Sequence, residues 1–298
     1  MITMYPKISI ITPSYNQAQF LEETILSVLN QNYPNLEYII IDGGSTDGSV
    51  EIIKKYQDRI AYWVSEKDEG HGDALNKGFK KATGEILAWI NSDDKYHAWA
   101  FSIVAEIFVT NNDVNWIAGL PSIWNKKGEL IAIQNERFNM YAFILMGFRR
   151  IIQQESVFFR KSLWEKAGGY ISRDYKLMID SELWSRFFAH DTLYNVNTCL
   201  AGFRFHTTNR SQLFSEQCAQ EHTRSATLLY ANSPEEVKKR VRTIQLFYKI
   251  KHSRFTRYFN FDFLHRLFAP DTYTKINFKV ITYSNETWKI KEEKFDYV

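Results

Sequence analysis

The feature that most restricts the fold of this chain is a short apolar run that ends in two adjacent carboxylates. Residues 86–90 (Ile-Leu-Ala-Trp-Ile) have the length and composition of a parallel strand that is covered on both faces. Asp93 and Asp94 follow almost at once, at the strand end where open α/β sheets bind ligands. Neighbouring carboxylates repel each other, and Mg²⁺ or Mn²⁺ favours such oxygen ligands. The alternative is a solvated loop in which Asp94 caps a helix beginning near His97.

The composition predicts a folded globular protein with one large domain or two smaller ones. Of the 298 residues, 45% are hydrophobic and 16% are aromatic, which is enough for a buried core. The formal net charge of +3 is too small to predict a nucleic-acid-binding protein. Cys199 and Cys218 form neither a disulfide framework nor a metal knuckle, and the N-terminus lacks a cleavable signal pattern, so we expect a cytoplasmic protein. The apolar stretch 140–148 is too short to span a membrane, which takes roughly 20 residues.

Strands alternate with helices over the first hundred residues. Before the strand at 86–90, the pattern predicts strands at 7–12, 36–41 and 60–64 and helices at 21–31, 47–56 and 73–82. This alternation predicts an α/β fold with a mostly parallel sheet, right-handed crossovers and helices on both faces.

The first two strands also end in polar residues at the edge where Asp93 is expected. Tyr15, which follows the first strand, is suited to stack on a ring. Asp42, which ends the second strand, is suited to accept hydrogen bonds from a base or a ribose. The alternative for Asp42 is a turn residue that satisfies nearby N–H groups. No dinucleotide fingerprint follows the first strand, and no phosphate-binding P-loop motif is present.

Four blocks of residues, taken in order, resemble glycosyltransferase family 2 with the GT-A (Rossmann-like) fold. The blocks are 8–16 (ISIITPSYN), 38–49 (YIIIDGGSTDGS), 73–84 (DALNKGFKKATG) and 91–94 (NSDD). The resemblance implies a nucleotide-diphosphate sugar as donor, with a UDP-sugar preferred, and Mn²⁺ or Mg²⁺ as cofactor. Where the family usually begins its D-x-D triplet with Asp, this chain has Asn91, so Asp93 carries more of the charge. The matching positions are Pro13, Tyr15, Asp42, Asp73, Asn91 and Ser92 for the donor and Asp93 for the metal.

The second half of the chain contains a candidate general base. Apolar residues recur at helical spacing through 178–188, which predicts an amphipathic helix with Asp180 in its first turn or at its N-cap. On the residues alone Asp180 is an ordinary capping residue, whereas the resemblance implies the catalytic base. The family often has Glu-Asp where this chain has Ile179 and Asp180. For His206, after a predicted strand, the resemblance implies a metal or diphosphate ligand; the alternative is a surface imidazole.

Two further segments of the second half are open to more than one interpretation. Short strands at 123–125 and 130–133 are expected to form a hairpin. Residues 138–148 favour a core helix over a flap near the acceptor. Residues 237–269 are basic and aromatic, and they predict a helical extension that either packs on the core or lies on an anionic membrane surface.

We therefore predict three parts in the chain and one reaction. Residues 1–230 form a GT-A glycosyltransferase domain, with a nucleotide-sugar half at 1–115 and an acceptor half at 116–230, and residues 231–298 form a mainly helical extension. The reaction is metal-dependent, inverting transfer of a sugar to a hydroxyl of a saccharide or lipid-linked acceptor in cell-surface polysaccharide synthesis. The alternatives are a nucleotidyltransferase and a non-catalytic sugar-nucleotide-binding module. We expect no nucleic-acid partner, and a location in the cytoplasm that includes the inner face of the membrane.

Overall fold

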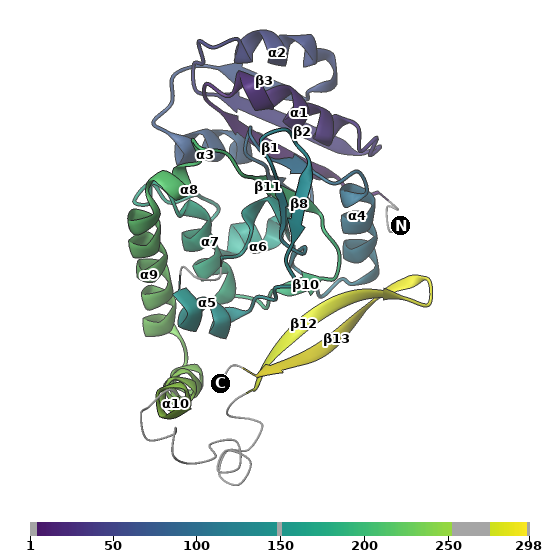
Figure 1. Cartoon of the computed structure of the whole chain (residues 1–298). Helices are drawn as coiled ribbons and strands as arrows, with labels where there is room; N and C mark the ends of the chain where they lie inside the picture. The colour runs from purple at the N-terminus through teal and green to yellow at the C-terminus, as the bar shows by residue number, and fades with distance from the viewer. Residues whose placement is uncertain (1–4, 148–150, 252–274, 297–298) are drawn as a thin grey trace.

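The fold is a large mixed sheet covered by helices on both faces (Figure 1). The computed structural model describes residues 5–147, 151–251 and 275–296. Within these residues the central sheet has the order β13-β12-β10-β6-β9-β4-β1-β2-β3, and a smaller sheet has the order β5-β11-β7-β8. The prediction of an α/β fold with a mostly parallel sheet is confirmed.

The first half of the chain forms four parallel strands with helical crossovers. Its elements are β1 (Ile8–Ser14), α1 (Ala18–Leu29), β2 (Leu36–Asp42), α2 (Ser49–Lys55), η1 (Gln57–Arg59), β3 (Tyr62–Ser65), α3 (His71–Lys81) and β4 (Ile86–Trp89). Ser14 of β1 pairs with Asp42 of β2, and Ile11 of β1 pairs with Trp89 of β4. Because these strands are parallel and aligned, their carboxyl ends lie at one edge of the sheet, as predicted.

The middle of the chain extends this sheet and adds the smaller one. Its elements are β5 (Lys95–Tyr96), α4 (Ala100–Thr110), β6 (Trp116–Ala118), β7 (Ser122–Trp124), β8 (Leu130–Ile133), α5 (Met140–Met146), η3 (Gln154–Ser156), β9 (Val157–Arg160), α6 (Lys161–Lys166), α7 (Ile179–Phe188), β10 (Tyr194–Val196) and β11 (Ala201–Arg204). The expected hairpin is present as β7–β8. Strand β9 runs antiparallel to β4, so the residues just before β9 lie at the edge where β4 ends.

Two alternatives from the sequence are decided here. Helix α4 begins at Ala100 and has no side-chain cap, so Asp94 does not cap it and that interpretation is wrong. Helix α5 buries Ala142 and Phe143, as expected for a core helix. Phe148, the last residue of that predicted segment, lies outside the described residues.

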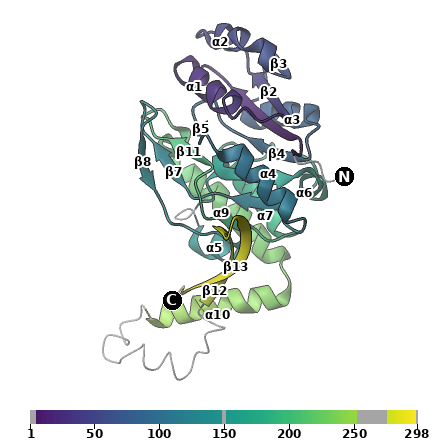
Figure 2. The same cartoon turned by 90° about the vertical axis from the view of Figure 1, so that its right-hand side faces the viewer.

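The C-terminal part contains α8 (Arg210–Leu213), α9 (Ser215–Asn232), α10 (Glu235–Lys251), β12 (Lys275–Ser284) and β13 (Thr287–Asp296). The helical region was expected, but the sequence analysis did not identify the β12–β13 hairpin, which joins the central sheet through β10. In both views α10 and the hairpin lie at the end of the molecule opposite α2 (Figures 1 and 2). Residues 252–269 of the basic segment lie outside the described residues. None of the helices described here has the length and apolar character needed to cross a bilayer.

Alternating side chains of the central strands fill two apolar layers. Ile10 and Ile40 face the layer formed with α1, α2 and α4, whereas Ile11 and Ile41 face the layer formed with α3, α6, α7 and α9. In the second layer the ring of Trp184 from α7 stacks on that of Trp89 from β4, with centroids 5.5 Å apart. Burial of aromatic rings is a large apolar contribution to stability. This contact fastens α7 to the strand that leads into the Asp93–Asp94 loop.

The close approach of α3 to β1 depends on Gly78. A Cβ atom added at Gly78 would lie 2.4 Å from Cγ2 of Ile11, which is fully buried and β-branched and therefore stiff. We expect Gly78→Ala to lower the free energy of unfolding by about 1–3 kcal/mol, measured by urea denaturation.

Gly72, in the same helix, is the matched control. A Cβ atom there would lie 3.4 Å from Ile171, an ordinary contact, so Gly72→Ala should be neutral or stabilising by roughly 0.5–1 kcal/mol. Equal effects of the two substitutions would contradict this account of the α3–β1 contact.

Candidate functional site

The structure brings His206 to the carboxylate of Asp93. The Nε2 atom of His206 lies 3.1 Å from Oδ2 of Asp93. The other ring nitrogen, Nδ1, lies 2.9 Å from the hydroxyl of Thr208, and the ring packs against Phe20 with centroids 4.7 Å apart. His206 is 4% exposed, so it is not the surface imidazole that the sequence left open. A buried imidazole held on both nitrogens is oriented for a fixed role beside Asp93.

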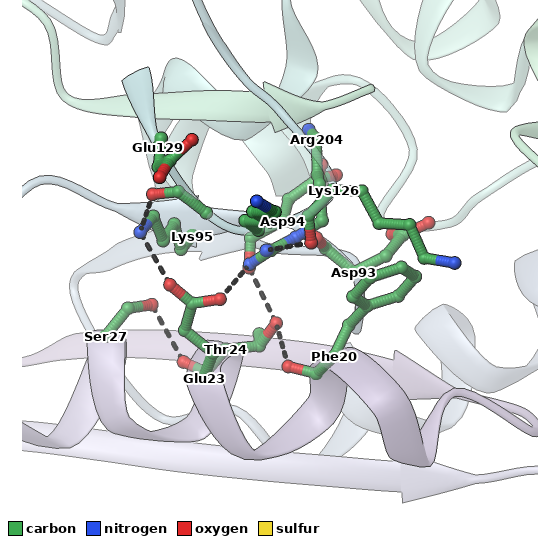
Figure 3. Close-up of polar contacts among 12 residues, drawn as sticks. Phe20, Glu23, Thr24, Ser27, Asp93, Asp94, Lys95, Lys126, Glu129 and Arg204 are labelled. Atoms are coloured by element: carbon green, nitrogen blue, oxygen red, sulfur yellow. Dashed lines mark hydrogen bonds and ion pairs between the residues drawn. The ribbon is translucent and has the colours of Figure 1, made fainter. Parts of the chain in front are cut away.

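Arg204, at the end of β11, holds the backbone of the Asp93–Asp94 loop. Its Nε donates to the carbonyl oxygen of Asp93 at 2.5 Å, and its backbone N–H donates to Oδ1 of Asp94 at 2.7 Å. Figure 3 shows the side chain between this loop and α1, where it also donates to Glu23 at 2.6 Å. Thr24 of α1 donates to the carbonyl oxygen of Asp94 at 2.6 Å. Arg204 is 1% exposed, so this fan of charge-assisted bonds is shielded from water.

Glu23 carries the counter-charge of this network. It accepts hydrogen bonds from Arg204 and from Lys95 (Figure 3). The Nζ of Lys95 also lies over the ring of Trp124, 4.2 Å from its centroid. Burial raises the pKa of Glu23, but the bonds from Lys95 and Arg204 outweigh it and the pKa is lowered overall. The carboxylate therefore stays ionised and keeps both cations paired.

Glu155 is a buried carboxyl group at this edge that the sequence analysis missed. It lies in η3, just before β9, and is 4% exposed, and its Oε2 atom has no hydrogen-bond partner among the described residues. Burial raises the pKa of Glu155, its own backbone N–H and a hydrogen bond with Asp94 lower it, and the charges of Asp180 and Asp93 raise it, for a net pKa of about 7. Burial and the nearby Glu155 likewise raise the pKa of Asp94 well above its usual range. Asp94 therefore retains its proton near neutral pH and Glu155 titrates around pH 7, whereas Asp93 is the more exposed acid. The signal in the sequence was the polar run 153–155 before an apolar strand.

Asp180 lies in the first turn of α7, as predicted, on the side of the molecule where Glu155 lies. Its Oδ1 accepts a hydrogen bond from the backbone N–H of Ser181 at 2.8 Å. Burial raises the pKa of Asp180, the backbone N–H groups of Ser181 and Asp180 lower it, and the negative charge of Glu221 raises it, for a net pKa of about 6. Because the charges of both Asp180 and Asp93 act on Glu155, the three carboxyl groups share one local field. A carboxylate with a pKa near 6 is a competent base at neutral pH.

Asp42 is fully buried and engaged in its own turn. Its carboxylate accepts hydrogen bonds from the N–H groups of Gly44 and Ser45, and from the hydroxyls of Ser45 and Ser65. This is the turn role that the sequence left as the alternative, and a donor contact from Asp42 stays a prediction. Pro13 is buried beside it, whereas Tyr15 is 63% exposed and presents its ring at the same sheet edge.

Asp73 lines a cavity of about 270 Å³ together with cationic residues that the sequence analysis did not single out. The cavity is lined by Glu69, Gly70, His71, Gly72, Asp73, Arg173, Tyr175, Lys176 and Arg210. Asp73 itself is paired with Arg173 at 2.6 Å. Burial and the charge of Arg210 lower the pKa of His71 to about 4, and Asp93 acts in the opposite direction. Arg173 is paired with both acids of the cavity, Glu69 and Asp73, so Lys176 and Arg210 supply its remaining positive charge.

The residues around Asp93 fit a divalent cation that also binds a substrate oxyanion. Among the described residues there is no group of three or more His, Cys, Asp or Glu side chains arranged to hold a metal alone. Asp93 and His206 offer one carboxylate and one imidazole, and the buried amide oxygen of Asn91 accepts no hydrogen bond from the described residues. Mg²⁺ is commonly bound by one or two carboxylates with substrate phosphates completing the shell. Ser92 is 5% exposed and its carbonyl oxygen accepts from Thr24, so its donor contact stays a prediction.

Residues 9–174 match the family model described as "Glycosyl transferase family 2". An uncharacterised glycosyltransferase of Rickettsia prowazekii is 31% identical over 215 residues, which are 68% of this chain and 66% of that protein. The putative teichuronic acid biosynthesis glycosyltransferase TuaG of Bacillus subtilis is 40% identical over 99 residues, 32% of this chain and 39% of that protein.

Solved structures with low sequence identity share the fold. Staphylococcus aureus TarS 1-349 in complex with UDP-GlcNAc has a TM-score of 0.64 at 16% identity, covering 90% of this chain and 78% of that one. The mannosyltransferase PcManGT from Pyrobaculum calidifontis in complex with GDP-Man and Mn²⁺ has a TM-score of 0.54 at 15% identity, covering 90% and 88%. The chain covers 44% of the longer S. aureus TarS structure, so it spans only part of that relative.

The raised pKa of Glu155 predicts a specific dependence of stability on pH. The folded state holds this proton to about pH 7, compared with 4.5 ordinarily, so this group contributes less stability as pH rises through that range. We expect the melting temperature of Glu155→Gln, relative to the parent, to increase from about pH 5 to about pH 8.

Glu37→Gln is the control, because the pKa of Glu37 is shifted in the opposite direction from that of Glu155. Burial raises the pKa of Glu37, but Lys7, Ser9 and Thr83 outweigh it and lower the pKa to about 2. Its stabilisation is present above about pH 4.5 and lost towards pH 2. The melting deficit of Glu37→Gln should therefore be constant from about pH 5 to about pH 8. The raised pKa of Glu155 would be contradicted if the difference in melting temperature from the parent changed with pH in the same way for both variants.

Proposed function

The chain belongs to glycosyltransferase family 2, and from this premise we propose that it transfers a sugar from a nucleotide-diphosphate donor to an acceptor hydroxyl with inversion. The observation that carries the proposal is the placement of Asp180, a carboxylate with a pKa of about 6, in one electrostatic neighbourhood with the Asp93 loop. Inverting transfer to a hydroxyl needs a base on one side of the sugar and charge stabilisation of the leaving group on the other.

The leaving diphosphate is held by residues of both halves of the chain. We assign Asp93 and His206, with the amide of Asn91, as the residues that would hold Mn²⁺ or Mg²⁺. A bound divalent cation neutralises negative charge that develops on the departing diphosphate. Lys176 and Arg210, which line the adjacent cavity, provide further positive charge for the donor. Tyr15, exposed at the sheet edge, stacks on the base.

Asp180 removes the proton of the acceptor hydroxyl as this oxygen attacks the anomeric carbon. Such general-base assistance contributes ~10²–10⁴ to the rate. The Trp184–Trp89 stacking and the first-turn position keep the carboxylate in place on α7. Burial keeps its pKa near neutrality, so the group is both ionised and basic at physiological pH.

The relatives support the class of donor and acceptor. TarS 1-349 was solved with UDP-GlcNAc, and TuaG is named for teichuronic acid biosynthesis. We therefore propose a UDP-sugar donor and a saccharide or lipid-linked acceptor in cell-surface polysaccharide synthesis. In this proposal the nucleotide-sugar half, residues 1–115, provides Asp73 and Asp93 for binding the donor. The acceptor half, residues 116–230, provides Asp180 for activating the acceptor hydroxyl.

Helix α10 supports contact of the extension with an anionic membrane surface. Leu246 and Ile250, one helical turn apart, are 57% and 41% exposed, and Arg242 and Lys249 are also exposed on this helix. Exposed apolar and basic side chains on one helix suit the headgroup region of a bilayer. Such contact would place the enzyme beside a lipid-linked acceptor.

Two substitutions separate donor binding from transfer. We expect Asp93→Ala to abolish Mn²⁺-dependent binding of nucleotide sugars, measured by titration calorimetry with a panel of UDP- and GDP-sugars. We expect Asp180→Asn to keep donor binding within about twofold and to lower kcat by ~10²–10⁴, because only the base is removed.

Asp113→Asn, an exposed change after α4, is the control that should alter neither measurement. Release of pyrophosphate from nucleoside triphosphates would favour the nucleotidyltransferase alternative. Turnover that survives Asp180→Asn unchanged would exclude Asp180 as the base. Donor binding without turnover on any acceptor would favour a binding module.

A further inference from the structure

Helix α7, which carries Asp180, begins without a cap from its own sequence. Its N-cap residue is Met178, whose side chain makes no capping hydrogen bond. The first N–H groups of a helix have no partner inside the helix and need one from elsewhere. The position of Asp180, two residues into the helix, therefore depends on what satisfies the backbone before it.

Glu221 of α9, from a distant part of the chain, holds the backbone N–H of the N-cap residue Met178 and of the two residues before it. Its carboxylate accepts hydrogen bonds from the backbone N–H groups of Leu177 and Met178, both at 2.9 Å, and of Lys176 at 3.2 Å. Gln217, one turn earlier on α9, donates to the same carboxylate at 3.0 Å and orients it. An anion at a helix N-terminus is also favoured by the helix dipole.

His222, the next residue of α9, holds the other side of Asp180. Its Nδ1 lies 2.6 Å from the hydroxyl of Ser181, and both residues are fully buried. Two consecutive residues of α9 thus hold the chain around Asp180. Glu221 binds the backbone of residues 176–178, and His222 contacts the side chain of Ser181. This arrangement ties Asp180 to α9 on both sides.

We propose that Glu221 is a positioning residue for Asp180, which anchors the start of α7 and places a fixed negative charge beside the base. The inference deepens the proposed function and rests on the role of Asp180 in it. Glu221 touches no reacting atom in this proposal and acts only through the segment 176–178 and through its charge.

The charges that face Asp180 agree with this role. After burial, the charge of Glu221 is the contribution that raises the pKa of Asp180. Burial raises the pKa of Glu221, but the N–H donors of Met178 and Leu177 outweigh it and lower the pKa overall, so Glu221 stays ionised. Burial lowers the pKa of His222, which keeps this ring neutral. The other groups nearby are Glu155 from η3, Cys218 from α9 and Arg210 from α8, which donates to the carbonyl oxygen of Lys176 at 3.2 Å.

The segment before α7 also connects the base to the cationic cavity. Arg173 and Lys176 line that cavity, and the segment then runs directly into the N–H groups that Glu221 holds. Anchoring this segment therefore fixes the spacing between the donor cavity and Asp180. A shift of about 1 Å between reacting groups can cost on the order of 100-fold in rate.

The experiment compares Glu221→Gln with the parent enzyme and with Glu37→Gln. Glutamine keeps an oxygen that accepts backbone hydrogen bonds but removes the charge. We expect the acid limb of the kcat/KM profile in Glu221→Gln to move to lower pH by about 0.3–1 unit, because the pKa of Asp180 falls. Glu37→Gln removes a buried, N–H-bound carboxylate beside Lys7, away from Asp180, and should leave this limb in place.

A second readout does not depend on turnover. The carboxyl carbon of Asp180 is followed by ¹³C NMR across the pH range in protein labelled at aspartate, with Asp180→Asn used to assign the signal. We expect its pKa to fall in Glu221→Gln by the same amount as the acid limb moves. An enzyme without transfer activity that still shows this NMR shift would overturn the proposed function and keep the positioning role.

Glu221→Asp tests the anchor separately from the charge. The shorter side chain keeps the charge but withdraws the acceptor from the helix start, so kcat should fall at least tenfold while the KM for the donor stays within about twofold. If Glu221→Gln does not fold, Glu221→Asp becomes the variant that tests the positioning role. The proposal is overturned by a Glu221→Gln protein whose Asp180 titrates as in the parent, by equal shifts in Glu37→Gln, or by Glu221→Asp with unchanged kcat.

Discussion

The buried guanidinium of Arg204 is the interaction on which the geometry of the site depends. A charge that is 1% exposed must be paired and fully hydrogen-bonded, because desolvation is costly. Arg204 meets this requirement through Glu23 of α1 and the carbonyl oxygen of Asp93 (Figure 3). Its guanidinium also lies 5.0 Å from the ring centroid of Phe20, which packs on His206. One side chain thus ties β11, α1 and the Asp93 loop together, and its planar fork of donors makes lysine a poor substitute.

The second constraint is the concentration of carboxyl groups at one sheet edge. Asp94 limits their mutual repulsion by holding a proton near neutral pH, and Glu155 titrates around pH 7, since burial raises the pKa of both. Asp93 lies beside His206 at this edge, and burial raises the pKa of Asp180, the proposed base, to about 6. Buried carboxyl groups lower the stability of a fold at neutral pH, and such a cost is typical of functional sites. The α7–α9 contact through Glu221 adds to the same field.

The residues that sequence reasoning located are those that follow strong local patterns. Asp93 follows an apolar strand, Asp180 begins an amphipathic helix, and both lie where the pattern placed them. Glu155 was missed because it precedes an antiparallel strand, and only the pairing of β9 with β4 brings it to the same edge. The β12–β13 hairpin was missed because its pairing with β10 is long-range and follows a segment dominated by basic and aromatic residues. For Asp42 the sequence pattern was ambiguous, because an aspartate at the end of a strand fits both a turn residue and a donor-binding residue. The structure shows its hydrogen bonds within the turn.

The α/β class, the parallel edge formed by β1, β2 and β4, and the family could be read from the amino-acid sequence, because strand and helix periods and ordered motifs are local properties of the chain. The contact of His206 with Asp93, the hydrogen bond of Arg204 to the Asp93 carbonyl and the anchoring of the segment before α7 by Glu221 became visible only in the folded chain. Those contacts join residues far apart in the chain, and they form because a charged or polar group that is buried needs a hydrogen-bond or ion-pair partner to offset its desolvation. No local pattern specifies which distant partner will satisfy a buried group.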